Sequence, residues 1–445
     1  KKLWSRKMSK RKNTCNGNKY ENSQNISLEA KVRKESFPSE NLEEFIHKIP
    51  KTDLHLHLDG SLRIATLLEL AQQVEVALPA TSEEGLKETL LKEHYADLAE
   101  YLQVFHYTVK IIQKGGLPVL ERIAYELAVD NFEEGVRYFE CRFAPQMFAK
   151  MADGGGSDIQ DILQAVDQGF ARAKQEYQNR HSEYDYGFEY GIIACAMRGH
   201  VEEWAPYFRE FWRLHEGKEP REIYGLLAED VVNEALEAKS QRGINSIVGI
   251  DLACTEAGFP AKIYRSAFEK ARQNFLGITV HAGEDYGPES MYQAVMETHA
   301  ERIGHGFHLF SAEKCDKTVK HPEDLVHNLS EYFAQRQIHL EVCLTSNEQT
   351  MSFLRGNLKE HKMKQMIERG MSVSINTDNR LVSSTNMCRE IRRAVEELDL
   401  SPYQLKKIIL EGFNKSFFPH TYSDKCNFYQ NMERHYRAVE KHFLL

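Results

Sequence analysis

The sequence predicts an α/β fold, a (β/α)8 TIM-type barrel with additional helices. Eight short apolar segments with strand character recur along the chain, and amphipathic segments at helical spacing separate them. Parallel strands require such crossover connections, so this alternation indicates a parallel sheet. The competing fold, a doubly wound open sheet, would place a glycine-rich phosphate loop after the first strand, and the sequence has none there.

The 445 residues are predicted to form one large domain behind a short tail. Barrels of this class commonly reach about 250 residues or more as a single unit, so residues 39–445 can be one barrel with extensions. Residues 1–38 are polar and basic and lack apolar periodicity. We expect them to be a disordered tail or an artefact of the start site, with Met8 as an alternative start.

Charge and composition disfavour several classes of partner. The first forty residues carry 11 Lys or Arg against 4 Glu, a net charge of +7. Because the net charge of the whole chain is −9, the remaining residues carry −16. Such an acidic body does not favour binding to nucleic acid. No apolar run reaches about 18 residues and no signal-peptide core is present, so we expect a cytoplasmic protein without a membrane partner. No protein partner is evident. The eight cysteines lack a C-x-x-C pair and fit reduced core thiols.

The first strand lies in the stretch 52–61, where apolar residues flank two histidines. Because side chains alternate between the faces of a strand, His55 and His57 point to the same side. Asp59 and Gly60 then break the strand where a loop over a site would begin. Because the two imidazoles converge, we interpret them as two ligands of a metal site and not as a solvent-exposed pair of histidines.

The other predicted elements continue the alternation of strands and helices. Strands are expected at 136–143, 190–197, 247–252, 277–281, 302–305, 340–344 and 372–376. Helical spacing is expected at 62–76, 95–112, 229–238, 262–275, 290–299 and 362–369, and in closing or extending helices at 387–398, 403–413 and 428–443. A loop at 153–157 offers Ser157 as the N-cap of a further helix with an apolar face from Ile159 to Phe170.

The carboxyl ends of the eight predicted strands collect metal ligands and titratable groups. A single histidine at a strand end is more often a hydrogen-bonded core residue than a ligand. Here, however, such residues occur at the same position in successive strand–helix units, which is hard to obtain by chance and indicates a site. In strand order these ends hold His55 and His57, Arg142, Met197 and Arg198, Asp251, His281 and Glu284, His305, Cys343 to Asn347, and Asp378 and Asn379.

Three imidazoles and one carboxylate form a nitrogen-rich set that suits zinc with an open position for water, although iron, manganese or cobalt could replace it. These predicted ligands are His55, His57, His281 and Asp378. Zinc lowers the pKa of bound water toward about 7 and so supplies a hydroxide at neutral pH. Glu284, three residues after a predicted ligand, and His305, one strand further, are then the predicted acid–base pair.

The chain resembles the adenosine deaminases of the amidohydrolase superfamily over about residues 45–420. The motifs TDLHLHLDGS, VGIDLA, HAGE, RIGHG and SINTDN occur in the order of that family. The resemblance implies a zinc-dependent hydrolytic deaminase that converts adenosine, and also 2′-deoxyadenosine, to an inosine-type product and ammonia. It implies that Glu284 protonates purine N1 and that His305 orients and deprotonates the attacking water. The fourth strand end, 249–252, lacks a lysine that could bridge two metals, which favours one Zn²⁺ per chain.

Three further residues are expected at the substrate through this resemblance. Asn379 stands where the family commonly has an aspartate that bonds purine N7, and its amide can donate to N7 without protonation. Cys254 replaces a glycine whose backbone N–H contacts purine N3. Asp59 resembles the residue near the 5′-hydroxyl, where a carboxylate disfavours a 5′-phosphate, so adenosine is preferred to AMP. Arg380 replaces a proline.

Two alternatives keep the same barrel. One is a deaminase of another 6-aminopurine, namely adenine, aminodeoxyfutalosine, cyclic AMP or another modified adenine nucleotide, with Arg380 or Arg198 as an anion contact or as a structural arginine. The other is an inactive nucleoside-binding protein, against which the intact set of ligands, Glu284 and His305 argues. A deaminase of the small cytidine type is excluded because no P-C-x-x-C motif occurs.

Overall fold

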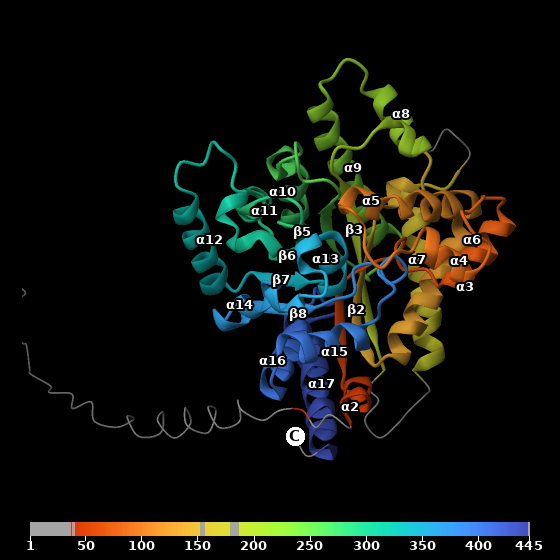
Figure 1. Cartoon of the computed structure of the whole chain (residues 1–445). Helices are drawn as coiled ribbons and strands as arrows, with labels where there is room; N and C mark the ends of the chain where they lie inside the picture. The colour runs from red at the N-terminus through yellow and green to blue at the C-terminus, as the bar shows by residue number, and fades with distance from the viewer. Residues whose placement is uncertain (1–36, 38–40, 152–155, 179–186, 444–445) are drawn as a thin grey trace, which may run out of the picture.

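Eight parallel strands form a nearly closed barrel in the computed structural model, which describes residues 37, 41–151, 156–178 and 187–443 (Figure 1). Each strand pairs in parallel with the next one along the chain, in the order β1 to β8. The strands are β1 Lys51–His57, β2 Val136–Phe143, β3 Glu189–Met197, β4 Ile247–Ala253, β5 Gly277–Ala282, β6 Arg302–His305, β7 His339–Val342 and β8 Ser372–Ile375. The predicted fold class and all eight predicted strands are confirmed, with no predicted strand end off by more than two residues.

The barrel closes where β1 meets the residues that follow β8. Leu56 and Asp378 form an isolated parallel bridge. The Asp378 N–H donates to the His55 carbonyl at 2.8 Å, and the His57 N–H donates to the Asp378 carbonyl at 2.8 Å. The seam therefore places the first and last predicted metal ligands side by side, although more than 300 residues separate them.

Helices surround the barrel and connect its strands. Those in the first half are α2 Leu42–Lys48, α3 Ile64–Gln73, α4 Glu83–Thr89, α5 Leu98–Leu102, α6 Val104–Glu133, α7 Ile159–Tyr177, α8 Pro206–Leu214 and α9 Pro220–Gln241. Those in the second half are α10 Arg265–Gln273, α11 Pro288–Thr298, α12 Pro322–Arg336, α13 Leu344–Thr350, α14 Met363–Glu368, α15 Met387–Leu398, α16 Pro402–Lys415 and α17 Tyr422–His442. As predicted, the last helices close the barrel, since α16 packs against both β1 and β8.

Two helix predictions need correction. The helix expected over 95–112 is divided at Gln103, and its second part continues as α6 to Glu133 because Gly116, with φ of 66°, joins two helical segments across the Gly-Gly-Leu-Pro stretch. The N-cap of α7 is Asp158, not Ser157. The Asp158 carboxylate accepts the Asp161 N–H while the Asp161 carboxylate accepts the Asp158 N–H, a reciprocal pair that a serine one residue earlier cannot make.

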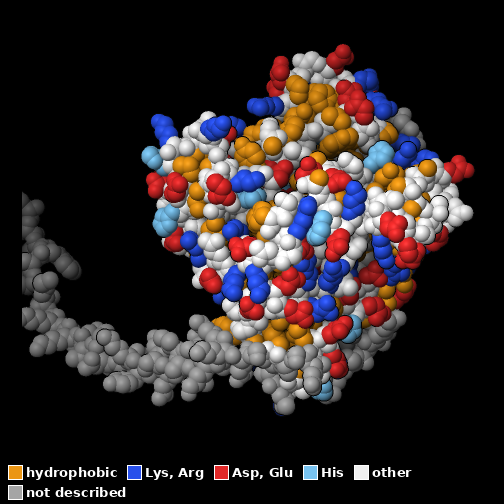
Figure 2. Space-filling model, in the orientation of Figure 1, with side chains coloured by type: hydrophobic (Ala, Val, Ile, Leu, Met, Phe, Trp, Pro, Cys, Tyr) orange, Lys and Arg blue, Asp and Glu red, His pale blue; other side chains and the backbone are white. Residues whose placement is uncertain are grey.

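The surface carries both signs of charge, and lysine, arginine, aspartate and glutamate side chains intermingle over the face in Figure 2. Apolar side chains gather near the top of that view, over the region of α8 and α9.

Among the described helices, none combines the length and apolar character needed to cross a membrane. Seven of the eight cysteines are free thiols, while Cys15 and nearly all of the tail 1–38 lie outside the described residues, as does most of the loop at 153–157.

Candidate active site

The four predicted metal ligands converge at the carboxyl end of the barrel. Nε2 of His57 lies 3.1 Å from Nε2 of His281, and Oδ1 of Asp378 lies 3.5 Å from His55 Nε2 and 3.4 Å from His57 Nε2. One ring nitrogen from each of the three histidines falls within 4.8 Å of the other two. Strands β1, β5 and the turn after β8 thus bring three imidazoles and one carboxylate to one point.

The polar atoms of this cluster fit a bound divalent cation. Nε2 of His55 is buried and makes no hydrogen bond to any residue that the structure describes. Burial lowers the pKa of both His57 and His281, which keeps these two rings neutral, as metal ligation requires. Nε2 atoms of neutral rings that face one another at 3.1 Å present lone pairs that a cation would satisfy. The donor set of three nitrogens and one oxygen suits zinc.

Asp378 owes its position to the closing turn. Its φ of 63° is unusual for a residue with a side chain, and the two backbone hydrogen bonds to β1 hold it there. Asp53 braces the same turn by accepting the Thr377 N–H at 3.2 Å and the Thr377 hydroxyl at 2.5 Å. Burial raises the pKa of Asp378, but His55, whose Nε2 lies 3.5 Å from Oδ1, and the imidazoles of His305 and His57 outweigh it, so the pKa is lowered.

Glu284 and His305, the predicted acid–base pair, lie together beside this cluster. Oε1 of Glu284 is 3.6 Å from Nε2 of His305. Burial, with the negative charges of Asp378 and Glu256, raises the pKa of Glu284 well above its ordinary value, which favours the protonated carboxyl group. A protonated carboxyl next to a neutral imidazole is a suitable donor and acceptor pair for general acid–base chemistry.

The sequence did not point to Glu256 and placed Asn347 only at the end of the seventh strand, but both residues hold this pair. The Glu256 carboxylate accepts the N–H groups of Gly283, Glu284 and Asp285 at 2.8, 2.9 and 3.3 Å, which fixes the loop that carries Glu284. Nδ1 of His305 lies 3.2 Å from the Asn347 amide nitrogen. Glu256 follows the VGIDLA motif by three residues, and that position was its only sequence signal.

The three predicted substrate contacts differ in their surroundings. Asp59 is buried, burial raises its pKa to about 7, and its Oδ1 has no hydrogen-bond partner in the described part of the chain. The Asn379 amide donates to the Tyr101 hydroxyl at 3.0 Å and its Oδ1 is left unpartnered among the described residues. Cys254 adopts φ of 80°, a conformation that suits the glycine it replaces, and it is half-buried.

The two arginines named as anion contacts are engaged by the protein itself. Arg380 donates to the Asn131 side chain at 3.1 Å and pairs with Glu134, so its guanidinium ties the turn after β8 to the end of α6. Arg198 is buried and donates to the carbonyls of Phe259 at 2.7 Å and His281 at 2.9 Å. Both contacts favour the structural interpretation of these arginines over binding of a substrate phosphate.

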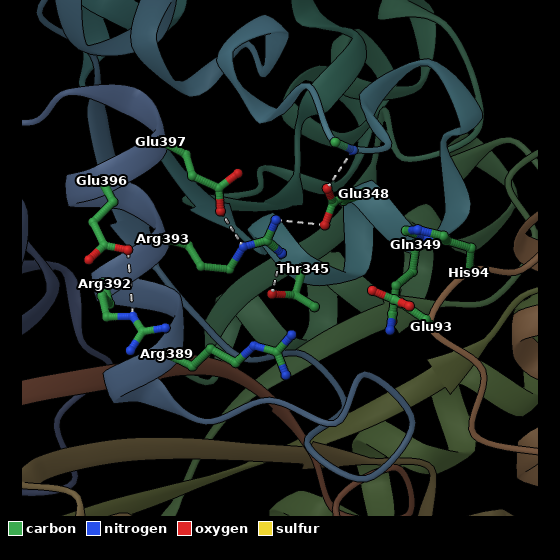
Figure 3. A pocket seen from close by; sticks show the side chains of 11 residues that line it. Glu93, His94, Thr345, Glu348, Gln349, Arg389, Arg392, Arg393, Glu396 and Glu397 are labelled. Carbon is green, nitrogen blue, oxygen red and sulfur yellow. Dashed lines mark hydrogen bonds and ion pairs between the residues drawn. The ribbon is translucent and has the colours of Figure 1, made fainter. Parts of the chain in front are cut away.

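A charged cavity of about 360 Å³ lies apart from the predicted site residues, beside α13 and α15 (Figure 3). Two of its arginines pair with its glutamates: Arg393 donates to Glu348 at 2.6 Å and Glu397 at 2.7 Å, and Arg392 lies 3.6 Å from Glu396. None of the predicted ligands, acid–base residues or substrate contacts lines it. We therefore assign the chemistry to the histidine cluster.

Comparisons with known proteins agree with this geometry. The sequence model of the family described as "Adenosine deaminase" matches residues 50–226 and 228–427. The adenosine deaminase of Klebsiella pneumoniae subsp. pneumoniae is 31% identical over 370 residues, which cover 83% of this chain and 94% of that protein.

Two solved structures share the fold. The adenine deaminase of Arthrobacter aurescens superposes with a TM-score of 0.66 at 20% identity and covers 87% of this chain and 98% of that one. The N6-mAMP deaminase of Arabidopsis has a TM-score of 0.65 at 24% identity, with 89% and 99% covered. The match to the family's sequence model spans most of the chain, and on that evidence this protein belongs to the adenosine deaminase family of metal-dependent hydrolytic deaminases.

Proposed function

We propose that this chain deaminates adenosine and 2′-deoxyadenosine with one Zn²⁺ held by His55, His57, His281 and Asp378. The observation that carries the proposal is the convergence of these four side chains with Glu284 and His305 at one end of the barrel. A divalent cation there would lower the pKa of bound water toward about 7. The net reaction consumes one water and replaces the 6-amino group by oxygen, which gives the inosine-type product and ammonia.

The chain's own residues supply the proton transfers. The protonated carboxyl of Glu284 donates to purine N1, which makes C6 electrophilic. Neutral His305 accepts a proton from the attacking water, and burial supports this role because it lowers the pKa of the imidazole well below its usual value. The exposed fraction of the His305 side chain is 1%, so bulk water does not compete for these positions.

The surroundings of Asp59 support an unphosphorylated nucleoside as the substrate. Its unpartnered Oδ1 can accept a hydrogen bond from a hydroxyl, and in its ionised form, with a pKa of about 7, the carboxylate repels a phosphate. Arg380 and Arg198, the arginines considered as phosphate contacts, are both committed to internal partners. The substrate proposed is therefore adenosine in preference to AMP.

A kinetic panel tests the substrate. Adenosine, 2′-deoxyadenosine, adenine, AMP, N6-methyl-AMP, cyclic AMP and aminodeoxyfutalosine are compared by kcat/KM from ammonia release. We expect the two nucleosides to exceed AMP by roughly 100-fold or more, since a lost hydrogen bond to a charged group and like-charge repulsion each cost about 1.5–3 kcal/mol. A higher kcat/KM for adenine or for any nucleotide would replace adenosine as the substrate.

Asp59→Asn tests the residue that makes this distinction. The amide removes the negative charge at nearly the same size, so kcat/KM for adenosine should fall roughly 10-fold while the ratio of AMP to adenosine turnover rises. Arg380→Lys is the matched control, because Arg380 pairs with Glu134 and should leave that ratio unchanged. An unchanged ratio in Asp59→Asn would remove Asp59 from the substrate site.

A further inference from the structure

Arg142 has no role in the site as described so far, although it is fully buried at the end of β2. Its guanidinium reaches across the barrel interior to two carboxylates. Nη1 lies 3.2 Å from Asp251 Oδ2, and Nη2 lies 2.7 Å from Glu341 Oε2. Nη2 also donates to the Leu54 carbonyl at 2.6 Å, one residue before His55. One side chain therefore connects β1, β4 and β7.

The two carboxylate oxygens that Arg142 contacts are the same ones that contact the predicted ligands. Nδ1 of His281 lies 2.8 Å from Asp251 Oδ2, and Nδ1 of His55 lies 2.9 Å from Glu341 Oε2. A carboxylate oxygen accepts hydrogen bonds, so in each ring Nδ1 is the nitrogen placed to carry the proton. Each ring is then the tautomer with its lone pair on Nε2, the atom that faces the centre of the cluster.

We propose that Arg142 is a positioning residue that fixes His55 and His281 together as Nε2 donors, by holding the carboxylates of Asp251 and Glu341 in place against Nδ1 of the two rings. The inference rests on the proposed metal position. A planar guanidinium can contact two carboxylates at once, whereas the point charge of a lysine ammonium can bridge them only by moving one of them. Without this bridge, two buried carboxylates inside the barrel would repel each other, and their histidines would lose a fixed orientation.

Arg302 offers a matched control in the same interior. It is 1% exposed, and it pairs with Glu140 and donates to Glu341 Oε1 at 2.7 Å. That oxygen is the one that does not contact His55. Arg302 is thus almost as buried as Arg142 and also contacts the Glu341 carboxylate. It does not contact Asp251 Oδ2 or Glu341 Oε2, the two oxygens that orient a histidine. A general effect of disturbing buried charge would appear equally in both variants.

The experiment compares zinc affinity in Arg142→Lys and Arg302→Lys by competition with a chelator, after thermal melts confirm that both are folded. We expect zinc to bind roughly 10- to 100-fold more weakly in Arg142→Lys, as is typical when a partner of a metal-binding histidine is disturbed, and within about threefold of wild type in Arg302→Lys. Equal affinity in Arg142→Lys and wild type, or equal losses in the two variants, would overturn the inference. Failure of the wild type to bind zinc would instead refute the proposed metal position.

A measurement on the wild type covers the case in which Arg142→Lys does not fold. In the zinc-loaded protein labelled with ¹⁵N at histidine and arginine, the Nδ1–H protons of His55 and His281 should give two downfield proton signals. Each should show a cross-peak to the Arg142 guanidinium, because both groups contact one oxygen. Proton signals on Nε2 of these rings, or cross-peaks to neither ring, would contradict the inference.

Discussion

Replacing His57 or Asp378 by alanine is expected to remove both the bound metal and the deaminase activity. Each side chain supplies one of four donors, and the remaining three would leave an open, poorly shaped site. Metal content, measured by elemental analysis after purification, should fall from close to one ion per chain toward zero, and turnover should fall with it. The backbone bonds that close the barrel at Asp378 do not involve its side chain, so the fold should survive.

His339→Ala is the matched control for this prediction. His339 is also a fully buried histidine at a barrel strand, but its two ring nitrogens bond the hydroxyls of Ser372 at 2.8 Å and Ser374 at 2.9 Å, away from the cluster. We expect this variant to lose stability and to keep its metal. If His57→Ala retained a full complement of metal, the ligand set would be wrong.

Glu284→Gln is expected to bind metal and substrate normally and to lose roughly 10²–10⁴-fold in kcat. Glutamine keeps the size and hydrogen bonding of the side chain but has no transferable proton. Burial raises the pKa of Glu284 and so favours its protonated form, with Asp378 and Glu256 adding to the effect. Steady-state kinetics with adenosine, combined with metal analysis, separates the loss of chemistry from the loss of binding.

The neighbouring Asp285→Asn controls for the change of charge in that loop, since the Asp285 side chain is exposed. It should leave kcat within a few-fold of wild type. Turnover near the wild-type rate in Glu284→Gln would reject the role of the proton donor. Loss of metal in that variant would instead move Glu284 into the coordination sphere.

The sequence pattern predicted the barrel and the cluster because both follow from short-range periodicity. His55 and His57 are two residues apart on a strand, so alternation alone places them on one face. His281, His305 and Asp378 lie at or after the ends of parallel strands, and a barrel brings those ends together.

The roles of the supporting residues could not be found in the same way, although the sequence placed Asp251 at a strand end. Asp251, Glu341 and Glu256 are single acidic residues in or after apolar segments, and only the register between strands shows which ring nitrogen or N–H group each one meets. The extent of α6 also escaped, because the Gly-Gly-Leu-Pro stretch does interrupt the helix, at Gly116, and a second helical segment follows it directly.

The central claim is that the histidine cluster holds one metal ion and deaminates adenosine. The most direct test incubates the purified protein with adenosine and follows ammonia release together with loss of the adenine absorbance band, before and after exhaustive chelation and again after Zn²⁺ is restored. We predict one ammonia for each adenosine consumed, loss of turnover on chelation, and recovery at one Zn²⁺ per chain. Full activity after chelation, or consumption of adenosine without release of ammonia, would contradict the account.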